Sequence, residues 1–202
     1  KLMHRLDQHP EEKKKALKIL YEIAADFSPH VFKAFKTFLD HTLDQLYDGI
    51  SLKIHDDLDI AALCKDHNVV LVPNHQSHAD YIAINYILAK KFDVSLHIAG
   101  GINLNIFPIG PLFRKSGCFF IRRTFTKDVL YRLTLEGYLY WLLLNNKPIE
   151  FFFEGGRSRT GKLRSPKFGL YQMLLEAHSQ INARAKKKLI FVPLSINHEN
   201  LP

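Results

Sequence analysis

The sequence predicts an α/β fold: a mostly parallel or mixed central sheet flanked by helices and preceded by a helical segment. Two observations support this prediction. From Asp59 onward, short apolar runs alternate with longer amphipathic runs, an order typical of strands and crossover helices around a parallel sheet. One apolar run, Phe151 to Phe153, has no polar alternation, as a strand buried on both faces requires.

Two helices are predicted before the α/β part. Residues 11–25 and 29–48 carry apolar side chains at three-to-four spacing, which is the period of an amphipathic helix. Ser28 is a suitable N-cap for the second helix, and Pro29 then takes its first position, where proline is tolerated. The pair would pack as a helical hairpin, either on the domain that follows or on an absent one. Residues 49–58 are predicted to be a connector.

Five strands and four helices are predicted after this connector, from apolar runs and from helical periodicity respectively. The strands are expected at 68–73, 94–99, 118–123, 149–153 and 189–196, and the helices at 79–91, 103–115, 126–145 and 166–184. Pro108 and Pro111 break the second of these helices, and Pro193 makes the last strand an edge strand or a strand beginning. We expect a helical N-terminal segment at 1–52 and an α/β domain at 53–202, as a fragment of a longer protein.

Composition narrows the class of protein. The 202 residues are 47% apolar, enough for one domain with a full core. The formal charge of +8 favours anionic partners such as phosphate, an acidic carrier or anionic lipid. Cys64 and Cys118 are expected to be reduced thiols. There is no run of about 18 apolar residues, so no membrane-spanning helix is predicted.

The most informative segment is the loop that follows the predicted strand 68–73. It places His75 five residues before Asp80, at a strand end, where α/β proteins collect ligands and catalytic groups. A histidine oriented by a carboxylate is a general base for an alcohol. Two alternatives remain: Asp80 only stabilises the helix start in a capping box with Ser77, or His75, His78 and Asp80 bind a metal.

Two further strand ends carry cations. Arg122 and Arg123 follow the predicted strand from Cys118, either as a phosphate fork or as solvated structural residues. After Phe153 comes Glu-Gly-Gly-Arg-Ser-Arg-Thr-Gly-Lys, in which Arg157 and Arg159 suit a phosphomonoester and the glycines let backbone N–H groups approach it. Leu163 replaces the hydroxyl residue of a Walker loop, which argues against a nucleotide triphosphatase.

A fourth segment, Phe191 to Glu199, is predicted to be a core strand interrupted by Pro193. His198 and Glu199 at its end are either a second acid–base pair or, as the simpler interpretation, a surface pair.

Taken in order, these segments resemble the four conserved blocks of the glycerolipid acyltransferases, and most closely those of members that acylate glycerol 3-phosphate or dihydroxyacetone phosphate. The blocks are Asn74-His75-x-x-x-x-Asp80, Phe119 to Arg123, Phe153 to Lys162 and Val192 to Ile196. The resemblance implies the glycerolipid acyltransferase fold, an acyl-CoA or acyl carrier protein as co-substrate, and no cofactor or metal.

The resemblance also implies roles for matching positions. His75 would be the general base and Asp80 its partner, while the acceptor phosphate would be held by Arg122, Arg157 and Arg159. The residues implied to shape the pocket or the donor side are Glu154, Gly155, Gly156 and Pro193. Gly156 stands where lysophosphatidate acyltransferases usually have threonine, which together with Arg159 favours glycerol 3-phosphate. The fourth block ends in Asn197-His198, where relatives often have an aromatic residue.

The expected reaction is acyl transfer to the sn-1 hydroxyl of glycerol 3-phosphate, the first step of phospholipid synthesis, with dihydroxyacetone phosphate or lysophosphatidate as alternative acceptors. A non-catalytic module that binds anionic lipid or phosphate is the rival, but it has no use for a histidine–carboxylate pair. Nucleic acid is not expected, because the cations lie in loops and no stacking-aromatic motif is present. The basic charge and lipid product predict membrane association on the cytoplasmic face, at the inner membrane if the protein is bacterial.

Overall fold

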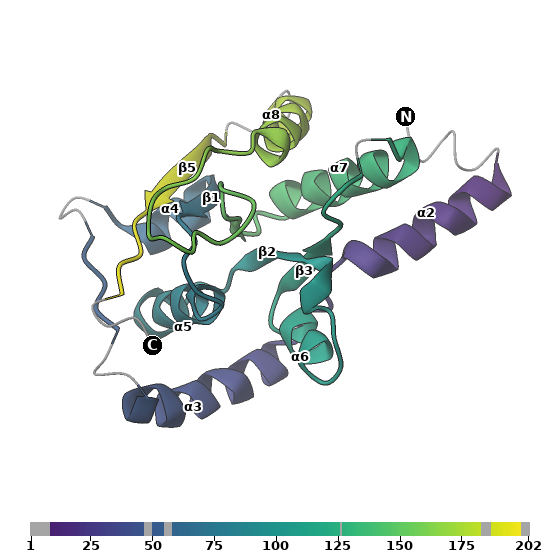
Figure 1. The fold of residues 1–202 in the computed structure, drawn as a ribbon. Coiled ribbons are helices and arrows are strands. Elements are labelled where there is room, and N and C mark those ends of the chain that lie inside the picture. The colour runs from purple at the N-terminus through teal and green to yellow at the C-terminus, as the bar shows by residue number, and fades with distance from the viewer. Residues whose placement is uncertain (1–8, 47–49, 55–57, 126, 183–186, 199–202) are drawn as a thin grey trace.

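The computed structural model describes residues 9–46, 50–54, 58–125, 127–182 and 187–198. Within these ranges, a five-stranded parallel sheet in the order β3-β2-β4-β1-β5 forms the centre (Figure 1). Its strands are β1 (Asn68–Pro73), β2 (His97–Gly101), β3 (Cys118–Ile121), β4 (Ile149–Glu150) and β5 (Leu189–Leu194). The predicted α/β class with a central parallel sheet is confirmed.

Helices cover both faces of this sheet. They are α2 (Pro10–Ile23), α3 (Pro29–Leu46), α4 (Ile60–Asp66), α5 (Asp80–Phe92), η1 (Ile102–Leu104), α6 (Ile109–Lys115), α7 (Val129–Leu144) and α8 (Gly169–Asn182). Because side chains alternate along a strand, β1 sends Val70 and Val72 into a core with α7 and α8, and Val69 and Leu71 into a second core with α4 and α5. All four side chains are buried.

The two N-terminal helices separate instead of forming the hairpin that the sequence suggested. Helix α2 packs on α7 and β3 and buries Ile23 completely, whereas α3 packs on α5 and α6 and buries Leu39 (Figure 1). The predicted start of α3 is confirmed: Pro29 is its first residue, and Ser28 Oγ accepts a 3.5 Å hydrogen bond from the Val31 N–H. Both helices therefore contribute to the packing of the α/β part.

Four strands are shorter than predicted because backbone groups at their ends bond elsewhere. The strand expected at 94–99 begins three residues later, since the Leu96 N–H donates to Asn85 Oδ1 at 3.2 Å. Strand β3 stops before Arg122, whose N–H donates to the Tyr131 hydroxyl at 3.0 Å.

Strand β4 has two residues, not five: the Phe151 N–H still donates to the Leu71 carbonyl oxygen at 3.1 Å, but the Phe152 carbonyl oxygen accepts from the Gly155 N–H at 3.0 Å, within the loop. Strand β5 ends at Leu194 instead of residue 196, since the Ile196 N–H and carbonyl oxygen bind the Asn74 side chain.

Other element predictions are confirmed or corrected at particular residues. Phe151 and Phe152 are buried in the two opposite cores, as expected, although they lie just beyond β4. Pro193 is exposed on β5, which is an edge strand as predicted. The helix predicted at 103–115 is divided into η1 and α6, on either side of the expected break near Pro108. Helix α4 was not predicted; Asp59 caps it by accepting from the Ala62 N–H at 2.9 Å.

Glu150 is an unusual residue in the middle of the sheet. Its side chain is fully buried, and neither carboxyl oxygen has a hydrogen-bond partner among the described residues. Burial, with a smaller contribution from the charge of Asp80, raises the pKa of Glu150 well above its ordinary value. Because an uncompensated buried polar group costs free energy, Glu150 lowers the stability of the fold.

We predict that Glu150→Met stabilises the protein by about 1–3 kcal/mol at pH 7, the cost of an unpaired buried polar group. The pKa of Glu150 is higher in the folded than in the unfolded protein, so folding binds a proton between the two values. Wild-type stability should therefore fall, relative to the variant, as pH rises above about 4.3. Urea unfolding at pH 4 and pH 8 measures this, with exposed Glu11→Met as control; an equal difference at both pH values contradicts it.

Candidate active site

The candidate site lies at the carboxyl edge of the sheet, where the segments after β1, β4 and β5 meet. These strands are direct neighbours in the sheet and run parallel, so their carboxyl ends lie side by side. The segment after β1 carries His75 and Asp80, the segment after β4 carries Glu154 to Arg159, and the segment after β5 carries His198. The topology thus brings together three of the four segments that the sequence singled out.

His75 and Asp80 form a buried pair. His75 Nδ1 lies 3.0 Å from Asp80 Oδ2, and the two residues are 2% and 0% exposed. The same Asp80 oxygen accepts hydrogen bonds from the N–H groups of Gln76 at 2.7 Å and Ser77 at 2.8 Å. Burial alone raises the pKa of Asp80, but hydrogen bonds, led by that from His75, lower it by more, so that the pKa lies below its usual value. The carboxylate form is therefore favoured.

The capping box suggested for Ser77 is half formed: Asp80 Oδ2 accepts from the Ser77 N–H at 2.8 Å, but Ser77 Oγ does not bind the Asp80 N–H in return. Helix α5 begins at Asp80 itself, and Ser77 Oγ accepts a hydrogen bond from the Ala79 N–H at 3.2 Å instead. The Asp80 carboxylate points back over the loop that precedes the helix, where it binds both the backbone and the ring of His75. Its structural contact with the loop and its contact with His75 therefore coexist.

His75 is fixed by its neighbours as well as by Asp80. Its N–H donates to Glu154 Oε1 at 3.0 Å, and its carbonyl oxygen accepts from the Ser158 N–H at 2.8 Å. The imidazole packs against the rings of Phe152 and Tyr81, with centroid distances of 4.0 and 5.0 Å. Backbone and ring are thus held by the segment after β4 and by α5.

The loop after β4 is shaped by Glu154 and two glycines. Glu154 is buried, and its second oxygen accepts a hydrogen bond from the Arg164 N–H at 3.1 Å, so one carboxylate joins His75 to the far side of the loop. Gly155 has a φ of +63°, which favours glycine. A Cβ on Gly156 would lie 3.0 Å from Arg164 Nη1. These contacts fix the course of the loop after β4 beside the His75 loop.

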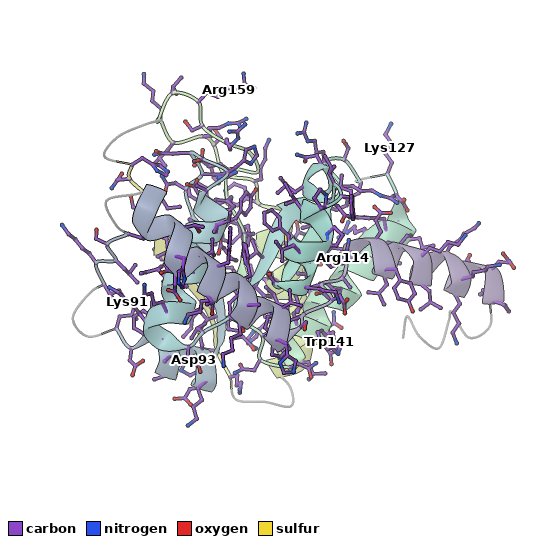
Figure 2. All side chains as sticks on the ribbon, turned by 90° about the horizontal axis from the view of Figure 1, so that it is seen from below. Lys91, Asp93, Arg114, Lys127, Trp141 and Arg159 are labelled. Atoms are coloured by element: carbon purple, nitrogen blue, oxygen red, sulfur yellow. The ribbon has the colours of Figure 1, made fainter. Side chains whose placement is uncertain are left out.

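The two loop arginines differ in their relation to the pair. Arg157 is exposed, and its carbonyl oxygen accepts a hydrogen bond from Arg164 Nη1 at 3.1 Å. Arg157 directly precedes Ser158, whose N–H binds the His75 carbonyl oxygen at 2.8 Å, so Arg157 lies beside the His75 loop. Arg159 is exposed at the outer end of its loop (Figure 2).

Arg122 stands apart from this group. Strands β2 and β4 lie between β3 and β1, which separates the ends of β3 and β1 by roughly 14 Å at the usual strand spacing. Arg122 Nε and Nη2 contact the two Glu22 oxygens at 2.6 and 2.7 Å, and Nη1 contacts Asp128 at 3.2 Å. Its guanidinium also lies 4.5 Å from the Tyr131 ring centroid. The structure gives Arg122 the contacts of a structural arginine that joins α2 and α7 to β3.

The structure brings His198 into the site, whereas the sequence left open a second acid–base pair or a surface pair with Glu199. His198 Nε2 lies 2.9 Å from Asp80 Oδ1, and its side chain is 17% exposed. Glu199, its proposed partner, lies outside the described residues. The alternation of side chains along a strand could have predicted this position. Val192, Leu194 and Ile196 all face the core beside α5, and His198 is the next residue in that series. Over the described ranges, no cluster of three or more histidine, cysteine or acidic side chains could hold a metal ion.

The fold and the site together define an α/β protein with a histidine–carboxylate pair at the carboxyl edge of a parallel sheet, beside a basic glycine-containing loop. The chain belongs to the acyltransferase family, since the family profile described as Acyltransferase matches residues 51–197. It is 41% identical over 192 residues to a glycerol-3-phosphate acyltransferase of Haemophilus ducreyi. That alignment covers 95% of this chain and 23% of the relative, so the chain spans about a quarter of the relative's length.

The double role of Glu154 leads to a prediction. In Glu154→Gln, one oxygen that accepts an N–H is replaced by an amide NH2, which cannot accept, so either the His75 or the Arg164 N–H loses its partner. Hydrogen bonds to charged groups contribute roughly 1.5–3 kcal/mol, and we expect a loss of stability of about that size in urea unfolding. Glu136→Gln, at a half-buried side chain paired with Arg132 on α7, serves as control. Equal stability of both variants would refute the role assigned to Glu154.

Proposed function

We propose that the protein transfers a fatty acyl group from an acyl thioester, of coenzyme A or acyl carrier protein, to the sn-1 hydroxyl of glycerol 3-phosphate, giving lysophosphatidate. The observation that carries the proposal is the buried contact of 3.0 Å between His75 Nδ1 and Asp80 Oδ2. The similarity to the glycerol-3-phosphate acyltransferase of Haemophilus ducreyi supports glycerol 3-phosphate as the acceptor. Dihydroxyacetone phosphate is the closest competing acceptor.

His75 is the general base in this reaction. Asp80 holds the Nδ1–H of the ring, so that Nε2 is the nitrogen that takes the proton of the acceptor hydroxyl. The hydroxyl oxygen forms a bond to the thioester carbonyl carbon, and the carbon–sulfur bond breaks as the tetrahedral intermediate collapses. The thiolate leaves with the electron pair of that bond, and the proton on His75 passes to it. Because a thiolate is already a good leaving group, the scheme uses no covalent enzyme intermediate and no resident cofactor.

Arg157 and Arg159 hold the acceptor phosphate. Both guanidinium groups are exposed, on the loop whose Ser158 N–H binds the His75 carbonyl oxygen. Arginine suits a phosphate because its planar donors match two oxygens at once. Arg157 makes the nearer contact and Arg159 closes the site from outside. Arg122 takes part only if the phosphate replaces Glu22 on its guanidinium.

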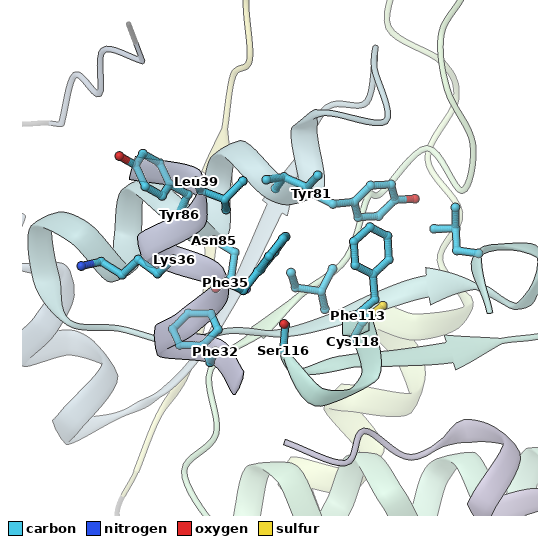
Figure 3. Close-up of a pocket in the computed structure, with 13 residues that line it drawn as sticks. Phe32, Phe35, Lys36, Leu39, Tyr81, Asn85, Tyr86, Phe113, Ser116 and Cys118 are labelled. Carbon is cyan, nitrogen blue, oxygen red and sulfur yellow. The ribbon is translucent and has the colours of Figure 1, made fainter. Parts of the chain in front are cut away.

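An apolar pocket suits the acyl chain of the donor. It is lined by side chains of α3, α5, α6 and β3, among them Phe35, Leu39, Phe113 and Cys118 (Figure 3). Tyr81 belongs both to this lining and to the aromatic contact with His75, whose ring centroid is 5.0 Å away. A chain bound there would contact Tyr81, whose ring packs on the proposed base His75.

The protein acts at a membrane surface, on the cytoplasmic face. The net charge of +8 favours anionic lipid. Three apolar side chains stand exposed in the segment before and at the start of α6: Ile106 at 66%, Phe107 at 85% and Ile109 at 53%. This segment adjoins the apolar pocket, which Leu104 and Phe113 line. In the described part of the chain, no helix is long and apolar enough to cross a bilayer.

The proposal predicts a preference among acceptors. With one acyl-coenzyme A as donor, kcat/KM should be higher for glycerol 3-phosphate than for dihydroxyacetone phosphate or lysophosphatidate, because a site that binds a substrate hydroxyl rejects analogues that lack it. His75→Ala should lower the rate by at least about 100-fold, the lower range for loss of a general base. A folded His75→Ala variant with near-wild-type activity, or a clear preference for lysophosphatidate, would overturn the proposal.

The phosphate assignment predicts a change in one Michaelis constant and not the other. Arg157→Ala should raise the KM of glycerol 3-phosphate about tenfold, the equivalent of one charge-assisted hydrogen bond, and leave the donor KM nearly unchanged. Arg159→Ala should have a smaller effect of the same kind. Arg132→Ala, which removes an exposed arginine paired with Glu136 on α7, is the control. Equal weakening of donor and acceptor by Arg157→Ala contradicts the assignment.

Membrane association is tested with vesicles that contain anionic lipid. Binding should weaken as ionic strength rises, since charges are screened beyond about 10 Å at 0.1 M salt. Phe107→Ser should weaken it about tenfold or more, because burial of a phenylalanine side chain contributes about 1.5–3 kcal/mol. Phe168→Ser, at a side chain 69% exposed before α8, is the matched control. Binding that neither salt nor Phe107→Ser affects would count against this surface.

A further inference from the structure

We infer that His198 is a positioning residue for the catalytic pair: its Nε2–H holds Asp80 Oδ1, and thereby fixes the plane of the carboxylate that orients His75. The inference rests on the proposed role of His75 as the base. It adds a third residue to the His75–Asp80 pair, contributed by the segment that follows β5.

The two oxygens of Asp80 are held very differently. Oδ2 accepts from the ring of His75 and from the N–H groups of Gln76 and Ser77, at 2.7 to 3.0 Å. Oδ1 has one partner in the described part of the chain, His198 Nε2 at 2.9 Å. Because Asp80 is 0% exposed, Oδ1 depends on this imidazole for a hydrogen bond, and a buried acceptor without one is costly.

The position of His198 is built by the surrounding backbone. Beyond the end of β5, Asn74 continues the pairing between β1 and β5 with its side chain: Asn74 Oδ1 accepts from the Ile196 N–H at 2.6 Å, and Nδ2 donates to the Ile196 carbonyl oxygen at 3.1 Å. The Asn74 N–H also donates to the Leu194 carbonyl oxygen at 3.3 Å. This clamp keeps the segment extended, so that His198, two residues after Ile196, lies on the face toward α5 and Asp80.

The contact also assigns the proton of His198. A carboxylate oxygen only accepts, so the proton of a neutral His198 is on Nε2, and no proton needs to move between His198 and Asp80 during the reaction. A carboxylate bound through one oxygen can rotate about its bond to Cβ. Contacts on both oxygens prevent this and keep Oδ2 in line with His75 Nδ1. We expect the contact of His198 with Asp80 to raise kcat and to leave KM unchanged, since neither substrate needs to touch His198.

Three variants separate this role from simple packing. In His198→Gln, the side-chain NH2 lies close to the position of Nε2–H and can donate to Asp80. In His198→Asn, the NH2 lies at the position of Nδ1 and does not reach Asp80. His198→Leu has no donor. We expect kcat to fall about tenfold in the asparagine and leucine variants, with both KM values within twofold of wild type, and to recover in the glutamine variant. His178→Gln on α8, whose ring contacts the Lys187 carbonyl oxygen, is the control and should not change kcat.

A measurement independent of activity distinguishes failure of this inference from failure of the proposed function. In the full-length protein labelled with ¹⁵N-histidine, the imidazole N–H proton that is lost in His75→Ala reports the His75–Asp80 hydrogen bond. It should shift or broaden in His198→Leu and stay in place in His198→Gln. An unchanged resonance in His198→Leu, or equal kcat in the glutamine and asparagine variants, overturns the inference. If the wild type has no acyltransferase activity but the resonance responds to the His198 variants as expected, only the proposed function is contradicted.

Discussion

The buried carboxylate of Asp80 is the interaction on which the rest of the site depends. It is the first residue of α5, so its backbone belongs to a helix that packs on the sheet, while its side chain reaches back over the loop from β1. Loop, helix and the segment after β5 all meet at this one group. A buried charge is stable only when hydrogen bonds compensate for lost hydration, so these contacts fix the loop and at the same time orient His75.

The sheet order explains why this arrangement is possible in so short a chain. Inserting β4 beside β1 puts the Glu154 loop against the His75 loop, and adding β5 on the other side of β1 supplies His198. Glu154 then joins two of these segments through a single side chain. The same strand order keeps the end of β3 distant from the His75–Asp80 pair. Arg122, at that end, therefore joins α2 and α7 through Glu22 and Asp128.

The sequence was a good guide to elements and to local pairs. The apolar run at 68–73 predicted strand β1 at its observed bounds, because a local apolar run decides where a buried strand lies. The pair His75–Asp80 could be expected because both residues lie within one loop. The contact of His198 with Asp80 spans 118 positions and depends on strand order, which local pattern does not specify. For the same reason Arg122 could be placed at the correct edge of the sheet but not paired with Glu22, 100 positions earlier.

The placement of α2 and α3 affects how a minimal active unit should be defined. The family profile begins at residue 51, yet Ile23 fills the core beneath α7 and Leu39 lines the apolar pocket. A piece cut at the profile boundary would expose the side chains that these helices cover and leave Arg122 without Glu22. The segment that matches the family profile is therefore shorter than the segment that folds as one unit. Expression, truncation and domain-exchange experiments should keep α2 and α3.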